Sequence, residues 1–151
     1  MILWRVSNYQ SPDGVGGPYV SGRWHTKGQP VVCCTLNPAT ALLESLIHME
    51  IDSEDRPERF QVLRIEGLDT LSIENIDADS LPPNWPEDMA FTRSIGDRWL
   101  SARRSLLLKV PSVLVPETWN VLVNPRHAEA SMLKIITVYE HAFDPRLFSQ
   151  A

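Results

Sequence analysis

An arginine, a tryptophan and a glutamate lie within one short segment, Ser21–Glu44, which reads SGRWHTKGQPVVCCTLNPATALLE. Arg23 and Trp24 follow a glycine at a turn, and Glu44 falls inside a helix that starts after a short β-branched strand. A guanidinium binds anions through a planar fork, an indole stacks on flat or cationic rings, and a carboxylate stabilises nearby positive charge. The three groups suit a ligand that is anionic at one end and aromatic and cationic at the other.

Each candidate also has an ordinary structural interpretation. Arg5, in the first expected strand, faces water or points into a cleft and holds a phosphate. Arg23 forms a surface ion pair of little energetic value or a second anion contact. Trp24, judged from sequence alone, belongs to the core. Glu44 lies on a helix surface, where it could pair with His48 four residues later.

Further along the chain, a serine and a histidine stand beside turn signals. Ser112 lies in Val-Pro-Ser-Val-Leu-Val-Pro, where a hydroxyl commonly bonds to backbone. The stretch Asn124-Pro125-Arg126-His127 predicts a turn after a strand, and a single histidine there is more typical of a surface than of an active site. Phosphate-binding loops, dinucleotide fingerprints, zinc-protease motifs and nucleophile elbows are absent from the sequence.

The two cysteines, Cys33 and Cys34, are adjacent in an expected strand. Neighbours in a strand point to opposite faces, so a disulfide between them is disfavoured, and the Cys-x-x-Cys spacing of a zinc site is missing. We interpret them as strand residues, one of them buried. A cysteine hydrolase using Cys34 and His127 is a weaker hypothesis, because nothing in the sequence indicates a lowered thiol pKa.

The composition is that of one globular domain, and we expect a single domain over 1–151. The chain has 43% hydrophobic and 22% charged residues, a net charge of −5 and a pI of about 5.3. An acidic chain is a poor direct binder of duplex nucleic acid. Neither a membrane-spanning run nor the pattern of a signal peptide is present, so we expect no membrane association and a cytoplasmic location.

Hydrophobic periodicity and turn residues predict an α+β fold with a mixed or antiparallel sheet and few helices. Ser11–Gly22 is expected to be a loop, and Asp69–Pro86 to be irregular with a short helical turn. Asn37-Pro38 reads as an N-cap followed by proline at the first helical position. The expected helices are Pro38 to about Glu50 and Glu87–Arg104, and the expected strands are Ile2–Ser7, Val31–Thr35, Arg59–Glu66, Leu106–Val110, Trp119–Val123 and Ile135–Tyr139.

Taken together, these features resemble the RES-domain family, named for its arginine, glutamate and serine. The matching motifs follow one another in order along almost the whole chain, from residue 3 to about residue 148. They are Leu3-Trp4-Arg5-Val6, Ser21-Gly22-Arg23-Trp24 with Gly28-x-Pro30, Ala41-Leu42-Leu43-Glu44, Val110-Pro111-Ser112 and Asn124-Pro125-Arg126-His127. The similarity is greatest to RES toxins encoded beside an Xre-like antitoxin.

The resemblance implies a compact version of the ADP-ribosyltransferase fold of the diphtheria-toxin type. Members of the family act on NAD+ as toxins of toxin–antitoxin pairs, by hydrolysis, by phosphorolysis or by transfer of ADP-ribose to a protein. NAD+ would be the substrate and no further cofactor is required. The implied catalytic residues are Glu44, Arg23 and Ser112, and the implied substrate-binding residues are Arg5, Trp24, Cys33, Asn124 and His127.

The same resemblance implies a partner, because an unrestrained NAD+ consumer would kill its own cell. The partner would be an Xre-like, DNA-binding antitoxin that covers the pocket, and a toxin homodimer could form within the complex. Many relatives carry a tyrosine of the NAD+ pocket where this chain has Cys33, and Tyr19 or Trp24 could supply the missing surface. Two alternatives stay open: a protein mono-ADP-ribosyltransferase, and a domain of weakened activity that binds a partner.

Overall fold

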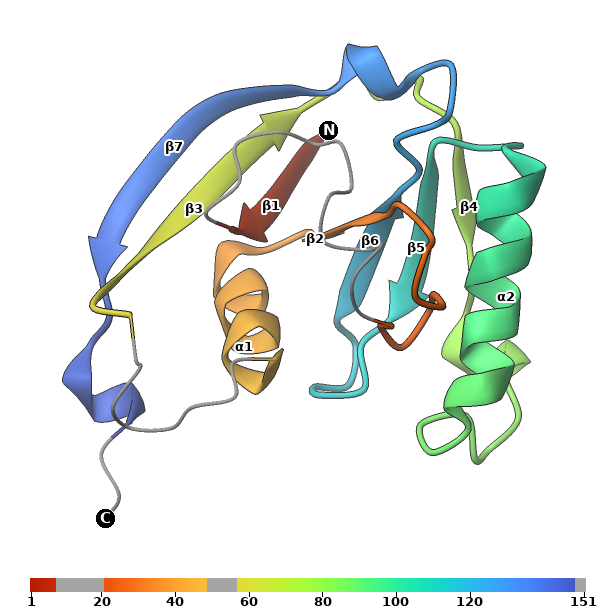
Figure 1. Cartoon of the computed structure of the whole chain (residues 1–151), viewed down its shortest axis with the longest axis horizontal. Coiled ribbons are helices and arrows are strands. Elements are labelled where there is room, and N and C mark those ends of the chain that lie inside the picture. Colours follow the sequence, from red (N-terminus) through yellow and green to blue (C-terminus); the bar gives the residue numbers. More distant parts are fainter. Residues whose placement is uncertain (8–20, 49–56, 149–151) are drawn as a thin grey trace.

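The computed structural model describes residues 1–7, 21–48 and 57–148 and gives an α+β fold (Figure 1). The two α-helices in these residues are α1 (Pro38–His48) and α2 (Met89–Ala102). Three short 3-10 turns are also described: Ala78–Ser80 and Ala130–Met132 lie between longer elements, and Pro145–Leu147 follows β7. The strands are β1 (Ile2–Val6), β2 (Val32–Thr35), β3 (Arg59–Glu66), β4 (Ile73–Asn75), β5 (Leu107–Pro111), β6 (Trp119–Val123) and β7 (Lys134–Ala142).

The described strands form one seven-stranded sheet in the order β4-β5-β6-β2-β1-β3-β7. The β4–β5 pair is parallel and all the others are antiparallel, so the sheet is mixed, as predicted. Figure 1 shows β7, β3 and β1 on one side of the molecule and β6, β5 and β4 on the other, with α2 beside β4 and β5. Helix α1 packs against β1 and β2. The helix therefore lies where the two halves of the sheet meet.

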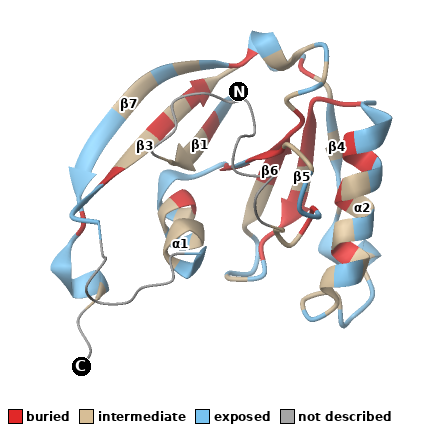
Figure 2. Ribbon diagram, viewed as in Figure 1, coloured by how far each residue is buried: buried red, intermediate tan, exposed pale blue. Residues whose placement is uncertain are grey.

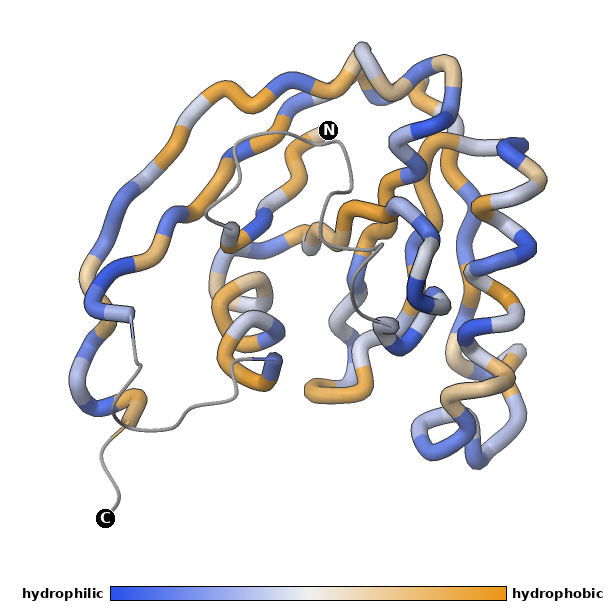
Figure 3. Tube along the Cα trace, in the orientation of Figure 1, coloured by the Kyte–Doolittle hydropathy of each residue, from blue (hydrophilic) through white to orange (hydrophobic). Residues whose placement is uncertain are grey.

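Two apolar clusters fill the two sides of this sheet. In the first cluster, buried residues of β1 and β3 pack with residues of β2, β5 and β6, so it joins the two halves of the sheet. The second cluster places α2 against β5 and β6 through Trp99, Leu100, Leu108, Val110 and Leu122. The central strands β2, β5 and β6 are buried over most of their length, while α2 exposes its outer face (Figure 2). Hydrophilic and hydrophobic residues are interspersed along α2 (Figure 3), as expected for a helix with one buried face.

The close approach of α2 to the segment before β2 depends on a glycine. A Cβ atom built on Gly96 would lie 1.6 Å from the carbonyl oxygen of Trp24. The hydroxyl of Thr92 donates to the carbonyl oxygen of Arg23 at 2.6 Å. The residue before the helix, Asp88, caps it, and its side chain accepts from the amide of Phe91 at 3.0 Å. These contacts fix the Arg23–Trp24 segment against the helix.

Most predicted elements agree with the structure. The bounds of β3 and β6 match the prediction. β1 and β2 differ from it by one residue at one end, β5 is shifted by one residue, and α2 is shorter by two residues at each end. β7 extends to Lys134–Ala142, beyond the predicted Ile135–Tyr139. The interpretation of Asp69–Pro86 as irregular was wrong at Ile73–Asn75, which forms β4 by parallel pairing with β5. The C-terminal end predicted for α1, Met49 and Glu50, and most of the Ser11–Gly22 loop lie outside the described residues.

None of the helices in the described ranges has the length and apolar character needed to cross a membrane.

Candidate active site

The position of Glu44 is set by a short connection between β2 and α1. Two residues, Leu36 and Asn37, separate the last residue of β2 from Pro38, the first of α1. The side-chain oxygen of Asn37 accepts from the amides of Ala39 at 2.8 Å and Thr40 at 3.4 Å. This confirms the predicted N-cap and starts the helix at a defined residue. Glu44 follows in the second turn and is half-buried.

The carboxylate of Glu44 is held by two side chains, one from the residue after β5 and one from β6. The hydroxyl of Ser112 donates to Oε1 at 2.7 Å, and Nδ2 of Asn120 donates to the same oxygen at 2.9 Å. The other oxygen, Oε2, accepts no hydrogen bond from the described residues. No hydrogen bond or ion pair joins His48 to Glu44 in these ranges. One carboxylate oxygen is therefore fixed while the other stays available to a ligand.

Ser112 is well placed for this contact because it follows β5 directly, at the start of the connection to β6. Its amide donates to the carbonyl oxygen of Thr118 at 2.9 Å, and its hydroxyl oxygen accepts from the amide of Leu114 at 3.1 Å. The residue is 8% exposed. The hydroxyl proton is therefore directed at Glu44, which brings two of the three catalytic residues implied by the resemblance into direct contact.

Asn120 was not a candidate from the sequence. It lies in β6 opposite Thr35 of β2, and Cys33 lies opposite Leu122. Because directly paired residues share a face and residues two apart in a strand do so as well, Cys33 and Asn120 lie on the same face of the sheet. The one sequence signal was an amide side chain in an otherwise apolar strand.

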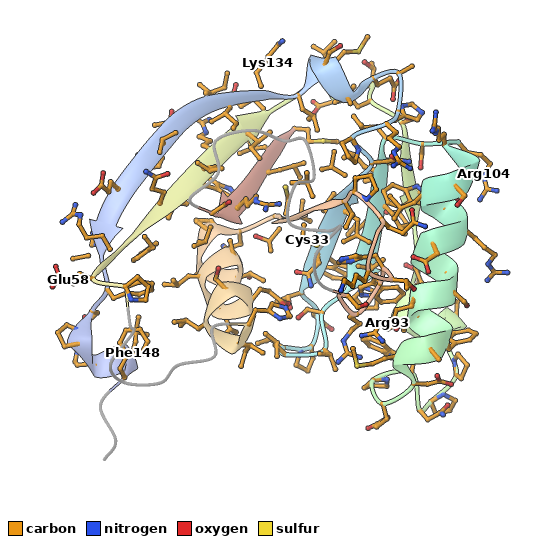
Figure 4. All side chains as sticks on the ribbon, viewed as in Figure 1. Cys33, Glu58, Arg93, Arg104, Lys134 and Phe148 are labelled. Carbon is orange, nitrogen blue, oxygen red and sulfur yellow. The ribbon has the colours of Figure 1, made fainter. Side chains whose placement is uncertain are left out.

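The charges of Arg5 and Glu44 both act on the thiol of Cys33. It keeps exposed surface, near the centre of the molecule in Figure 4. The surrounding protein raises the pKa of its thiol by desolvation, the guanidinium of Arg5 opposes that change, and the carboxylate of Glu44 adds to it. A thiol with a raised pKa is a poor nucleophile at neutral pH.

Cys34 faces the opposite side of β2 and is 1% exposed. Burial raises the pKa of its thiol to about 12, with a smaller opposing effect from Arg5. The hypothesis of a cysteine hydrolase based on this thiol therefore has no support, because the thiolate is scarce at neutral pH.

Arg5 carries an unsatisfied donor. It lies in β1 opposite Leu63 of β3, and its Nε is buried without a hydrogen-bond partner in the described residues. A buried N–H without an acceptor costs free energy that an anion could recover. The charge of Arg5 also lowers the pKa of the Cys33 and Cys34 thiols, so the guanidinium lies near β2, the strand that leads to α1 and Glu44. A cation that could bind an anionic ligand is therefore present near this strand.

Arg23 and Trp24 are held on the α2 side of the molecule. The guanidinium of Arg23 donates to the carbonyl oxygen of Pro86 at 2.6 Å, and no contact with Glu44 or Ser112 is present in the described residues. Trp24 is 3% exposed and packs on the ring of Trp85 with centroids 5.9 Å apart. That burial matches the core interpretation of the indole.

Asn124 and His127 lie beyond the other end of β6. Asn120 and Asn124 are four residues apart in extended chain, about 13 Å at 3.3 Å per residue. Asn124 is buried and donates to the carbonyl oxygen of Leu100 at 3.0 Å. Nδ1 of His127 accepts from the amide of Glu129 at 3.2 Å. In the described residues Asn124 bonds to α2 and, through its oxygen, to the amide of Arg126, His127 bonds within the turn after β6, and neither forms a hydrogen bond with Glu44.

The arrangement can stabilise a cation and bind an anion. A fixed carboxylate with one free oxygen suits a positive charge that develops on a sugar, and it can accept a hydrogen bond from a ribose hydroxyl. A guanidinium with an unsatisfied buried N–H suits a phosphate.

Comparisons with known proteins agree with the motif pattern. The RES domain model matches residues 2–144. "Toxin Res" of Pseudomonas putida is 47% identical over 148 residues, which cover 98% of this chain and 100% of that protein. "Prs ADP-ribosylating toxin" of a Sphingobium species is 34% identical, with 99% of this chain and 98% of that protein aligned. "Toxin Res" of Yersinia enterocolitica is 38% identical over 89% of this chain and 88% of that protein.

Proposed function

The chain belongs to the RES-domain family, and on that basis we propose that it is a toxin that cleaves NAD+ at the bond between nicotinamide and ribose. In this reaction the C–N bond breaks and nicotinamide leaves with the electron pair as a neutral molecule. No general acid is needed for that departure. The oxygen of water or phosphate then bonds to the ribose carbon, and the attacking group loses a proton if it is water. Repeated turnover of this reaction would deplete the cell of NAD+.

One observation supports this proposal most strongly: the half-buried carboxylate of Glu44 has one oxygen fixed by Ser112 and Asn120 and the other free of donors in the described residues. The transition state carries positive charge on the ribose, as in glycoside hydrolysis. A carboxylate that is already oriented stabilises this charge without reorganising. Ser112 takes the role of orienting the acid.

The arginines would bind the diphosphate. Arg5 has an unsatisfied buried N–H and lies within electrostatic range of Cys33. Arg23 would have to exchange or share its contact with the carbonyl oxygen of Pro86 to reach the same ligand. We therefore assign Arg5 the larger share of diphosphate binding in this chain, and Arg23 a contribution when NAD+ is bound. Cys33 remains a proposed contact of the substrate. Trp24, Asn124 and His127 are proposed with it, and each would have to change its present packing or hydrogen bond to reach NAD+.

The wider setting follows from the same membership. We propose that residues 1–151 form a single RES domain with an ADP-ribosyltransferase-like fold of the diphtheria-toxin type, acting in the cytoplasm. Relatives named as toxins support a neutralising partner, for which we propose an Xre-like, DNA-binding antitoxin. The net charge of −5 fits a complex in which the partner supplies the DNA contact. A toxin homodimer within that complex is part of the same proposal.

A second candidate function is transfer of ADP-ribose to a protein. It is favoured by the relative from Sphingobium, whose name describes an ADP-ribosylating toxin. The same carboxylate would serve, because the bond that breaks is the same and only the acceptor differs. A partner-binding domain of weakened activity is a third candidate, and the cysteine at position 33 is the feature that favours it.

The deciding experiment mixes the purified full chain with NAD+ and identifies the products by mass spectrometry. Free ADP-ribose indicates hydrolysis, ADP-ribose-1″-phosphate indicates phosphorolysis, and a modified protein in an added cell extract indicates transfer. The expected result is rapid release of nicotinamide with a free or phosphorylated ADP-ribose product. Intact NAD+ after prolonged incubation, with and without extract, would refute both enzymatic proposals.

A further inference from the structure

We propose that Asn120 is a positioning residue of the active site, which holds the carboxylate of Glu44 in the orientation that the reaction needs. This inference rests on the proposed function of Glu44 and adds a residue to it. It is carried by the geometry of one side chain, by the absence of other partners for that side chain, and by its place in the sheet.

The contact itself is short and directional. Nδ2 of Asn120 donates to Oε1 of Glu44 at 2.9 Å, and the hydroxyl of Ser112 donates to the same oxygen at 2.7 Å. Two donors on one oxygen fix both the position and the rotation of a carboxylate. With Ser112 alone, the carboxylate could still rotate about that single bond. The second donor therefore decides which way Oε2 points.

The other end of the Asn120 side chain indicates that the residue does not serve stability. Its Oδ1 is buried and has no hydrogen-bond partner in the described residues. A buried acceptor without a donor destabilises a fold, and an apolar side chain of similar size would avoid that cost. The paired residue across the sheet, Thr35, is satisfied elsewhere, since its hydroxyl donates to the carbonyl oxygen of Asn37. A costly group that contacts the acid is best explained by function.

The surrounding strand supports the same assignment. β6 is Trp119-Asn120-Val121-Leu122-Val123, and its three last residues are buried in the two apolar clusters. These clusters hold the strand in register with β2 and β5, so Asn120 is carried on a rigid element. Rigid support is what a positioning contact requires, because a displacement of about 1 Å can cost about 10²-fold in rate.

The test compares Asn120→Val with the wild type and with Asn75→Val as a matched control. Asn75 is an exposed asparagine in β4, so the control makes the same chemical change in a strand without touching Glu44. For Asn120→Val we expect kcat for NAD+ loss to fall about 10- to 100-fold. KM should change less than about twofold, because Asn120 contacts the acid and not the substrate. The melting temperature should stay equal or rise.

Asn120→Asp serves as the second variant, because it keeps the size of the side chain and replaces the donor with an oxygen that repels Glu44. We expect it to lose at least as much kcat as Asn120→Val, and Asn120→Gln to recover part of the loss. Asn75→Val should keep wild-type kinetics. Growth arrest on induction in cells should follow the same order as kcat.

The outcomes separate the two proposals. A wild-type chain that consumes NAD+ together with an Asn120→Val variant of equal kcat overturns the role of Asn120 and leaves the proposed function standing. A lower kcat accompanied by a large fall in melting temperature also overturns it, since the residue would then act through stability. A wild-type chain that neither consumes NAD+ nor arrests growth overturns the proposed function, and the role of Asn120 falls with it.

Discussion

Replacing Glu44 with glutamine tests the central chemical claim with almost no change in shape. The glutamine amide oxygen can still accept from Ser112 and Asn120, and its nitrogen takes the place of Oε2, which has no donor in the described residues. The two hydrogen bonds lose their assistance from charge, which costs about 1 kcal/mol of folding free energy. For a chain of this size that is a shift of about 2–4 °C in melting temperature. The fold should therefore survive.

The effect on rate should be far larger than the effect on stability. A carboxylate oxygen about 4 Å from a developing unit charge, at an effective dielectric constant of about 20, contributes about 4 kcal/mol. Removing that charge should lower the rate of NAD+ cleavage about 10³-fold. The assay is single-turnover release of nicotinamide at saturating enzyme, with the melting temperature measured on the same samples.

A matched control for Glu44→Gln is Glu87→Gln, which neutralises an exposed carboxylate just before α2. The control should keep the wild-type rate, so any loss in Glu44→Gln cannot come from net charge alone. A Glu44→Gln protein that retains its fold and cleaves NAD+ within tenfold of the wild type would refute the electrostatic role of this acid.

Three further predictions follow from contacts elsewhere. Arg5→Ala should raise the Kd for NAD+ about tenfold or more with little change in melting temperature, because the buried Nε has no partner in the described residues; calorimetry that gives an unchanged Kd would remove Arg5 from the site. Gly96→Ala should destabilise the fold by about 1–3 kcal/mol or more in thermal unfolding, because its methyl group would overlap the carbonyl oxygen of Trp24; an unchanged melting temperature would contradict that contact. Because the pKa of the Cys34 thiol is raised, the folded chain keeps this proton at a pH where the unfolded chain has lost it. The free energy of unfolding should therefore fall as the pH rises above about 9, by up to about 1.4 kcal/mol per pH unit, and Cys34→Val should lessen this fall. Equal pH profiles of stability for the two proteins would argue against this effect.

The elements that could be predicted from the sequence are those whose signals are local. β3 alternates polar and apolar residues on each side of the Val62-Leu63 pair, and the Asn37-Pro38 pair marks the start of α1. β4 could not be found this way, because Ile73–Asn75 is three residues long and becomes a strand only by pairing with β5, more than 30 residues later. Local pattern carries no information about such a partner.

The residues of the candidate site also divide into those that could be predicted from the sequence and those that could not. The resemblance to the family supplied Glu44 and Ser112, and the structure joins them by a hydrogen bond. Asn120 was missed because an asparagine in a strand looks like a surface residue until its cross-strand neighbours are known. Burial of Trp24 followed from its type.

The junction between β2 and α1 has a consequence for how this chain can vary. Helix α1 turns by about 100° and advances about 1.5 Å for each residue. A single insertion or deletion between Pro38 and Glu44 would therefore swing the acid roughly a quarter of a turn away from Ser112, whatever residue was added. Substitutions of side chains on the solvent side of this stretch should be tolerated, whereas changes in its length should not. Insertions and deletions among relatives should therefore fall outside the segment from Thr35 to Glu44.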